Sequence, residues 1–165
     1  MKKKINHEYL QSGIFGINDA LVSTTGVMVG VSAGVSSKEV IILAGVVTIV
    51  VEALSMGSGQ YLSLKSSHQY QKKSGLKEPA ISGLVMFLGY IVGGLVPLVP
   101  IALLPVEQSR VAAIVGALFG LFVLGYLKGK FVKVSPIKSA IEVVVIGGLA
   151  AAAGLIIGSA FDVSL

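Results

Sequence analysis

The sequence predicts an all-α membrane protein with five transmembrane helices, and three observations support this fold class. Hydrophobic residues make up 54% of the chain, charged residues only 13%, and the mean hydropathy is +0.89. A soluble domain carries about 25% charged residues, so this chain has too few polar residues to cover a water-facing surface. Its apolar residues also gather in five separate stretches, and its basic residues gather on one side of them.

Each apolar stretch is long enough to cross a bilayer, which takes about 20 mainly apolar residues. The stretches cover residues 13–35, 39–63, 80–104, 110–128 and 138–161. Short polar connections separate them, so we expect a single transmembrane domain over residues 1–165. The first stretch is too long for the apolar region of a cleavable signal peptide, and Asn18 and Asp19 make it too polar. We therefore expect the N-terminus to be retained.

The basic residues predict the orientation in the membrane. With five spans the termini lie on opposite sides, and one side collects Lys2, Lys3, Lys4, Lys65, Lys72, Lys73, Lys77, Lys128, Lys130, Lys133 and Lys138. The other side has only Lys38 and Arg110. The positive-inside rule then predicts a cytoplasmic N-terminus. The net charge of +5 is thus a topology signal rather than a nucleic-acid-binding patch.

Small residues recur at a spacing that lets membrane helices approach closely. The pattern GxxxG occurs at 26–30, 89–93, 116–120 and 154–158, within a total of 21 glycines. Such patterns favour a compact bundle and allow a dimer interface. The alternative is that glycine is simply common in membrane helices.

The third stretch contains GGLVPLVPIALLP, in which Pro97 and Pro100 each lack a backbone donor. Proline kinks or breaks a helix, and broken helices often line transport sites. We expect a helix break at these residues. The alternative is an ordinary helix end near the outer surface.

Three acids fall within the apolar stretches: Asp19, Glu52 and Glu142. Acids inside a membrane usually face the bundle interior or water and often mark ion paths. At about 1.5 Å per residue, Asp19 and Met56 lie at similar depths of roughly 10 Å, and Glu52 is one turn deeper. Glu142 lies close to the cytoplasmic end, four residues after Lys138, and is expected to form an ordinary ion pair with it.

Glu52, Met56 and Gln60 are spaced i, i+4 and i+8, so they share one helical face. If this face meets Asp19, one pocket holds carboxylate and amide oxygens together with a thioether. That set of donors favours a divalent first-row metal such as Fe²⁺ or Mn²⁺. A mid-bilayer charge costs at least about 2.5 kcal/mol, so a titrating Glu52 beside the pocket fits cation/proton exchange. The alternatives are that Asn18 and Asp19 cap a helix and that Met56 is a packing residue.

Histidine and cysteine offer little further chemistry. The chain has no cysteine, and its two histidines, His7 and His68, lie in polar segments. A disulfide framework, a thiolate site and a histidine-based zinc centre are therefore not expected. No nucleophile pairs with a base, so an intramembrane enzyme is disfavoured as well.

Several motifs resemble the vacuolar iron transporter family. GINDALVSTTGVMVGVSAG is similar to its first-helix signature, EALSMGSGQYLSLKS to its second, and GGLVPLVP to its third-helix proline motif. LGYLKGKF and SPIKSAIEVVVIGGLAAAAGLIIG resemble its last two helices. These motifs cover nearly the whole chain in the same order.

The resemblance implies a five-helix homodimer that moves Fe²⁺ or Mn²⁺ out of the cytoplasm in exchange for protons. The metal is the transported substrate, and no cofactor is permanently bound. Asp19 and Met56 match the family's ligands, which both protomers contribute. Glu52 would act as a ligand or proton carrier, and Gln60 as a supporting oxygen donor. Proton coupling is expected to involve both Glu52 and Asp19. We expect a multi-pass protein of a prokaryotic cell membrane, or of the vacuolar membrane in a eukaryote.

Two features depart from the family pattern. Gln60 stands where many members have glutamate, and the connection SLKSSHQYQKKSGLKEP is short and basic where some members insert a glutamate-rich metal-gathering domain. These departures motivate an alternative function, a membrane metal-binding or assembly protein of the same fold that does not transport.

Overall fold

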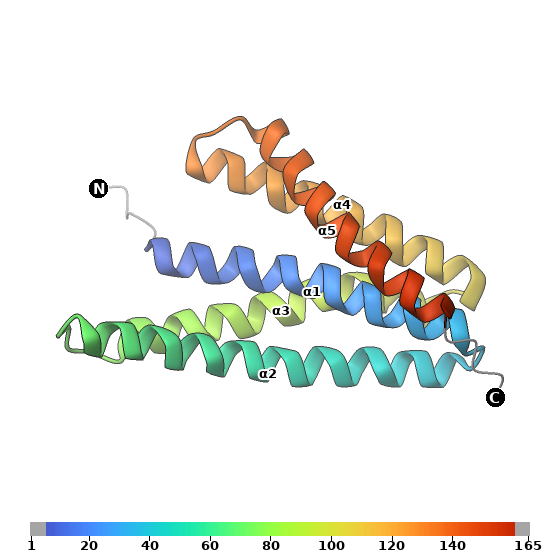
Figure 1. Cartoon of the computed structure of the whole chain (residues 1–165), viewed down its shortest axis with the longest axis horizontal. Helices are drawn as coiled ribbons and strands as arrows, with labels where there is room; N and C mark the ends of the chain where they lie inside the picture. Colours follow the sequence, from blue (N-terminus) through green and yellow to red (C-terminus); the bar gives the residue numbers. More distant parts are fainter. Residues whose placement is uncertain (1–5, 161–165) are drawn as a thin grey trace.

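The computed structural model describes the backbone of residues 6–160 and the side chains of residues 6–149, 152, 153 and 156. Within this part the chain is all-α, with five helices (Figure 1). They are α1 (His7–Gly34), α2 (Lys38–Tyr70), α3 (Lys77–Leu103), α4 (Val106–Val132) and α5 (Pro136–Ala160).

The helices extend beyond the apolar stretches because capping residues, rather than the edges of the stretches, mark where several of them begin or end. Asn6 caps α1, since its side chain accepts a hydrogen bond from the Glu8 N–H at 3.0 Å. Ser37 caps α2 in the same way at Val40. Lys133 ends α4 in the left-handed conformation, with φ of 61°. The helices therefore continue into the polar segments at the ends of the bundle.

Four helices, α1 to α4, are long and apolar enough to cross a membrane, as the sequence predicts. The fifth, α5, has 25 residues, which at about 1.5 Å per residue is also enough to span about 30 Å. The chain is thus a multi-pass helical bundle.

Helix α1 is the centre of the bundle, since it packs against all four other helices and most extensively against α3. In Figure 1, α2 and α3 lie along one side of α1, and the α4–α5 hairpin crosses on the other. Glycine allows the closest approach: a Cβ at Gly93 would lie 2.8 Å from the Ala20 Cβ. The GxxxG pattern at 89–93 therefore packs α3 on α1 within one chain.

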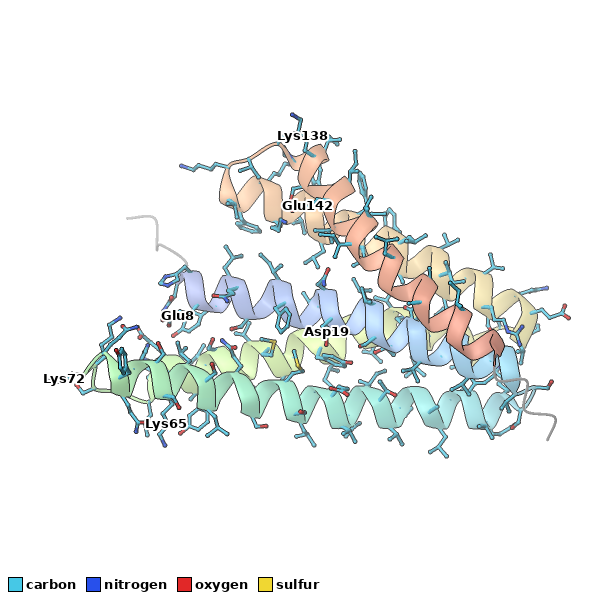
Figure 2. All side chains as sticks on the ribbon, viewed as in Figure 1. Glu8, Asp19, Lys65, Lys72, Lys138 and Glu142 are labelled. Atoms are coloured by element: carbon cyan, nitrogen blue, oxygen red, sulfur yellow. The ribbon has the colours of Figure 1, made fainter. Side chains whose placement is uncertain are left out.

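The basic residues separate as predicted. The start of α1 and the α2–α3 connection share one end of the bundle, where Figure 2 shows Lys65 and Lys72, and the α4–α5 connection lies in the same half of the bundle. We call this the lysine-rich end. Lys38 and Arg110 lie near the first residues of α2 and α4, at the opposite end. Lys2, Lys3 and Lys4 are outside the described residues, and the cytoplasmic location of this end stays a prediction.

The predicted helix break at Pro97 and Pro100 is wrong. Both prolines lie inside α3, which continues without interruption to Leu103. Proline at 97 leaves the Gly93 carbonyl without its helical donor, but neighbouring hydrogen bonds keep the helix together, and the Pro100 carbonyl accepts from the Leu104 N–H at 2.9 Å. The helix ends just past Pro100, so the alternative of an ordinary helix end holds.

The predicted partner of Glu142 is also wrong. Glu142 pairs with Lys128 of α4, at 3.3 Å, and not with Lys138 of its own helix. The close packing of the α4–α5 hairpin brings Lys128 beside it, since a Cβ at Gly125 would lie 2.7 Å from the Ser139 carbonyl oxygen. The Glu142 side chain is exposed, so this pair is a peripheral one.

Candidate functional site

Asp19 lies in the interior of α1, about three turns after its first residue. The N-cap of this helix is Asn6, so a capping role for Asn18 and Asp19 is excluded. The Asp19 side chain is half-buried, and Figure 2 shows it midway along the bundle. An acid in this location cannot be explained by helix capping.

The structure brings Met56 and Glu52 of α2 to the part of α1 that carries Asp19. Met56 packs against a buried cluster formed by Ala20, Ala53 and Tyr90. Ala20 directly follows Asp19 and Ala53 directly follows Glu52, so this packing places the segments that carry the two acids beside each other. The part of α2 that carries Met56 therefore packs beside the part of α1 that carries Asp19, while a shared metal pocket stays a prediction.

Tyr90 of α3 completes this group and was not predicted from the sequence. Its side chain is fully buried, and its hydroxyl lies 2.6 Å from the Ser23 Oγ. Ser23 donates its own proton to the Asp19 carbonyl at 2.7 Å, so Tyr90 is the donor to Ser23. A lone tyrosine in an apolar stretch was the only signal in the sequence.

Gln60, one turn beyond Met56, makes its contact elsewhere. Its Nε2 donates to the Ser82 Oγ of α3 at 3.2 Å. Ser82 is in turn 2.6 Å from the Ser12 Oγ, and Ser12 donates to the Glu8 carbonyl at 2.8 Å. The Gln60 amide nitrogen thus joins a chain of hydrogen bonds that runs towards the lysine-rich end.

The group around Asp19 is only partly buried. Asp19, Glu52 and Met56 are each half-buried, whereas Tyr90 behind them is fully buried. Part of each of these three side chains therefore stays accessible in a single chain, within its membrane-spanning part. Oxygen and sulfur donors together suit a first-row divalent metal.

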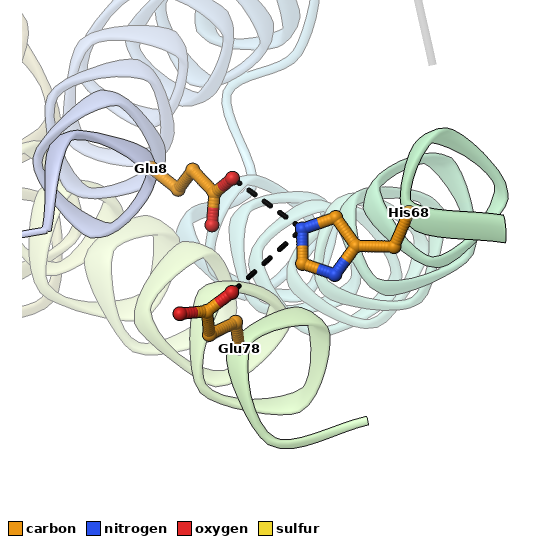
Figure 3. A group of neighbouring side chains, drawn as sticks. All are labelled: Glu8, His68 and Glu78. Carbon is orange, nitrogen blue, oxygen red and sulfur yellow. Dashed lines mark ion pairs between the residues drawn. The ribbon is translucent and has the colours of Figure 1, made fainter. Parts of the chain in front are cut away.

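A second group of ligand-type side chains lies at the lysine-rich end, and the sequence did not predict it. Glu8 of α1, His68 of α2 and Glu78 of α3 each point a ligand atom towards the others, and these atoms lie within 4.8 Å of one another (Figure 3). Their positions in the sequence are far apart, so spacing alone gave no signal. The histidine that the sequence left without a role is thus the buried centre of a cluster.

The fold and the group around Asp19 define an integral multi-pass membrane protein with carboxylates and a thioether inside its helix bundle. The sequence profile described as the VIT family matches residues 10–78 and 71–159, and the chain belongs to that family. The two matched parts meet at the α2–α3 connection.

Curated relatives agree with this assignment. The chain is 30% identical over 158 residues to vacuolar iron transporter homolog 3 of Arabidopsis thaliana, covering 88% of this chain and 79% of the relative. It is 26% identical over 208 residues to vacuolar iron transporter 1 of the same plant, covering 88% and 83%. Vacuolar iron transporter 1 of Oryza sativa subsp. japonica is also 26% identical, with 88% and 82% covered.

Proposed function

We propose that this protein transports Fe²⁺ or Mn²⁺ across a membrane, out of the cytoplasm and in exchange for protons. The observation that carries the proposal is the packing of Met56 against the cluster of Ala20, Ala53 and Tyr90, which places a thioether of α2 beside the segments that carry Asp19 and Glu52. The names of the relatives, vacuolar iron transporters, support iron as a substrate.

In this proposal Asp19 and Met56 are the primary ligands. A carboxylate accepts either metal, and the softer sulfur favours Fe²⁺ over Mg²⁺ or Ca²⁺. Tyr90 holds Ser23, and through it the backbone beside Asp19, in place. Gln60 is a supporting oxygen donor, and its amide nitrogen donates to the Ser82 Oγ.

Proton exchange follows from the nearness of Glu52 to Asp19. A metal ion and a proton compete for the same carboxylate oxygens, so metal binding releases protons. Release of the metal on the far side then lets Glu52 take up a proton for the return step. Glu52 is therefore the proposed proton carrier.

A homodimer completes the proposed site. Asp19 and Glu52 keep part of their surface open in the single chain, and exposure of a charged side chain to hydrocarbon is costly. A second copy that covers this face removes that cost and adds a second Asp19 and Met56 to the metal.

The test is Mn²⁺ uptake into proteoliposomes under an imposed pH gradient. We expect Asp19→Asn and Glu52→Gln to lose at least about tenfold in rate, while Glu142→Gln, a matched acid outside the group, stays near the parent. Uptake by Asp19→Asn and Glu52→Gln at the parental rate would refute the site. Mn²⁺ binding without uptake by the parent would favour the non-transporting alternative.

A further inference from the structure

We propose that Glu8, His68 and Glu78 form a second divalent-metal site at the lysine-rich end of the bundle. The site takes a first-row transition-metal ion, such as Mn²⁺, Fe²⁺ or Zn²⁺. As a binding site it stands on its own geometry. As a station where transported metal first binds, it rests on the proposed function.

Three helices build this cluster. Glu8 lies in the first turn of α1, His68 in the last turn of α2 and Glu78 in the first turn of α3. The Asn6 cap fixes the start of α1, and the packing of α1 and α2 on α3 brings the three ends together. Figure 3 shows both carboxylates turned towards the imidazole. The cluster therefore depends on tertiary packing, because each of its residues comes from the end of a different helix.

The centre of the cluster is buried. His68 is only 4% exposed, and among residues 6–160, whose backbone the structure describes, neither its Nε2 nor the Glu8 Oε2 finds a hydrogen-bond partner. The Nε2 lies 3.5 Å from the Glu8 Oε1 and 3.8 Å from the Glu78 Oε2, which is beyond ordinary hydrogen-bond length. Buried polar atoms are nearly always paired, so this nitrogen calls for a partner between the two carboxylates.

A metal ion would supply the missing partner of the His68 Nε2 with little movement of the side chains. With bonds of about 2.1 Å, neighbouring ligand atoms around a tetrahedral or octahedral ion lie about 3.0–3.4 Å apart. The two nitrogen–oxygen distances are only slightly longer than that. One imidazole and two carboxylates suit the first-row divalent ions better than Ca²⁺ or Mg²⁺, which prefer oxygen alone.

The cluster also has an entry path and a polar connection inwards. The Glu78 side chain is 53% exposed, so an ion can reach the site from water. On the inner side, Gln60 donates to Ser82, Ser82 to Ser12, and Ser12 to the Glu8 carbonyl. This line of polar groups ends one turn from Met56, which gives the cluster a polar link towards the Asp19 group.

A proton is the competing occupant. An imidazolium at His68 between two carboxylates would make an ion-pair triad that binds no metal. A metal site and an ion-pair triad differ in whether the His68 nitrogen coordinates a bound metal. Since His7 and His68 are the chain's two histidines, a nitrogen signal can be assigned with two variants.

The experiment is pulsed electron paramagnetic resonance of Mn²⁺ bound to the full chain in detergent, after removal of any purification tag. We expect ¹⁴N modulation from a histidine ligand in the parent and in His7→Gln, and none in His68→Gln. Asp19→Asn should keep the modulation, which separates this site from the transport site. Parental protein without ¹⁴N modulation, or His68→Gln with it, would overturn the proposal.

A second variant, Glu78→Gln, tests the site even if His68→Gln misfolds. Glu78 is exposed, so Glu78→Gln should keep the parental melting temperature while Mn²⁺ affinity at the nitrogen-containing site falls about tenfold. Lys77→Gln, at the neighbouring position, should not weaken it. Equal affinity in Glu78→Gln and the parent would mean that the carboxylate is not a ligand and would contradict the site.

Discussion

The Tyr90 hydroxyl lies 2.6 Å from the Ser23 Oγ, and Ser23 donates its proton to the backbone carbonyl of Asp19. This chain of contacts ties α3 to the part of α1 that carries the central acid. It explains how three helices, rather than the two that the sequence indicates, position the group around Asp19.

Removal of this hydroxyl should impair transport more than folding. In Tyr90→Phe one neutral hydrogen bond is lost, which costs about 1 kcal/mol, so the chain should still fold. Loosening of Ser23 beside Asp19 should weaken the apparent affinity for Mn²⁺ by about fivefold, the equivalent of that energy. Concentration series of uptake measure this. Tyr126→Phe, on α4 beside Lys130, is the matched control and should transport like the parent.

Proton coupling should depend on Glu52 and not on Gln60. The Gln60 amide has no titratable proton, and its nitrogen is bonded to Ser82. In proteoliposomes with a pH-sensitive dye inside, Glu52→Gln should lose metal-driven proton movement. Gln60→Ala should keep the parental ratio of protons to Mn²⁺, even at a lower rate. A changed ratio in Gln60→Ala would show that the amide takes part in coupling.

Close packing of α2 on α3 should be sensitive at Gly57 and insensitive at Gly59. A Cβ at Gly57 would lie 2.9 Å from the Phe87 Cβ, whereas one at Gly59 would meet no atom of the described residues within 4 Å. Overpacking typically costs about 1–3 kcal/mol, and alanine favours a helix by about 1 kcal/mol over glycine. Gly57→Ala should therefore melt at a lower temperature in detergent than the parent, and Gly59→Ala at the same or a higher one. Equal melting of the two variants would contradict the packing.

The lysine-rich end should face the cytoplasm. The chain has no cysteine, so single cysteines report without background. Gln71 and Gln108 are both exposed and lie at opposite ends of the bundle. An impermeant maleimide added to intact cells should label Gln108→Cys and not Gln71→Cys, and lysed cells should label both. The reverse pattern would invert the orientation.

The helices and the shared face of Glu52 and Met56 on α2 could be predicted from the sequence because both follow local rules. Apolar length predicts a span, and the i, i+4 spacing of Glu52 and Met56 predicts a shared face. The alignment of that face with Asp19 rested on matching depths from opposite membrane surfaces, and the packing of Met56 agrees with it.

What the sequence could not give depends on contacts between distant segments. Tyr90 reaches Ser23 across a helix interface, and His68 meets Glu8 and Glu78 only where three helix ends come together. The same holds for Glu142, which has a candidate partner on its own helix but pairs with Lys128 across the hairpin. The break expected at Pro97 and Pro100 failed because the packed helix tolerates two missing donors near its end.

The central claim is that metal binds between α1 and α2, at Asp19 and Met56. A crystal of the protein soaked in Mn²⁺ and measured for anomalous scattering tests it most directly. We expect an anomalous peak in contact with the Asp19 carboxylate and the Met56 sulfur, absent from Asp19→Asn crystals soaked in the same way. A well-occupied peak at Glu8, His68 and Glu78 with none at Asp19 would contradict the claim.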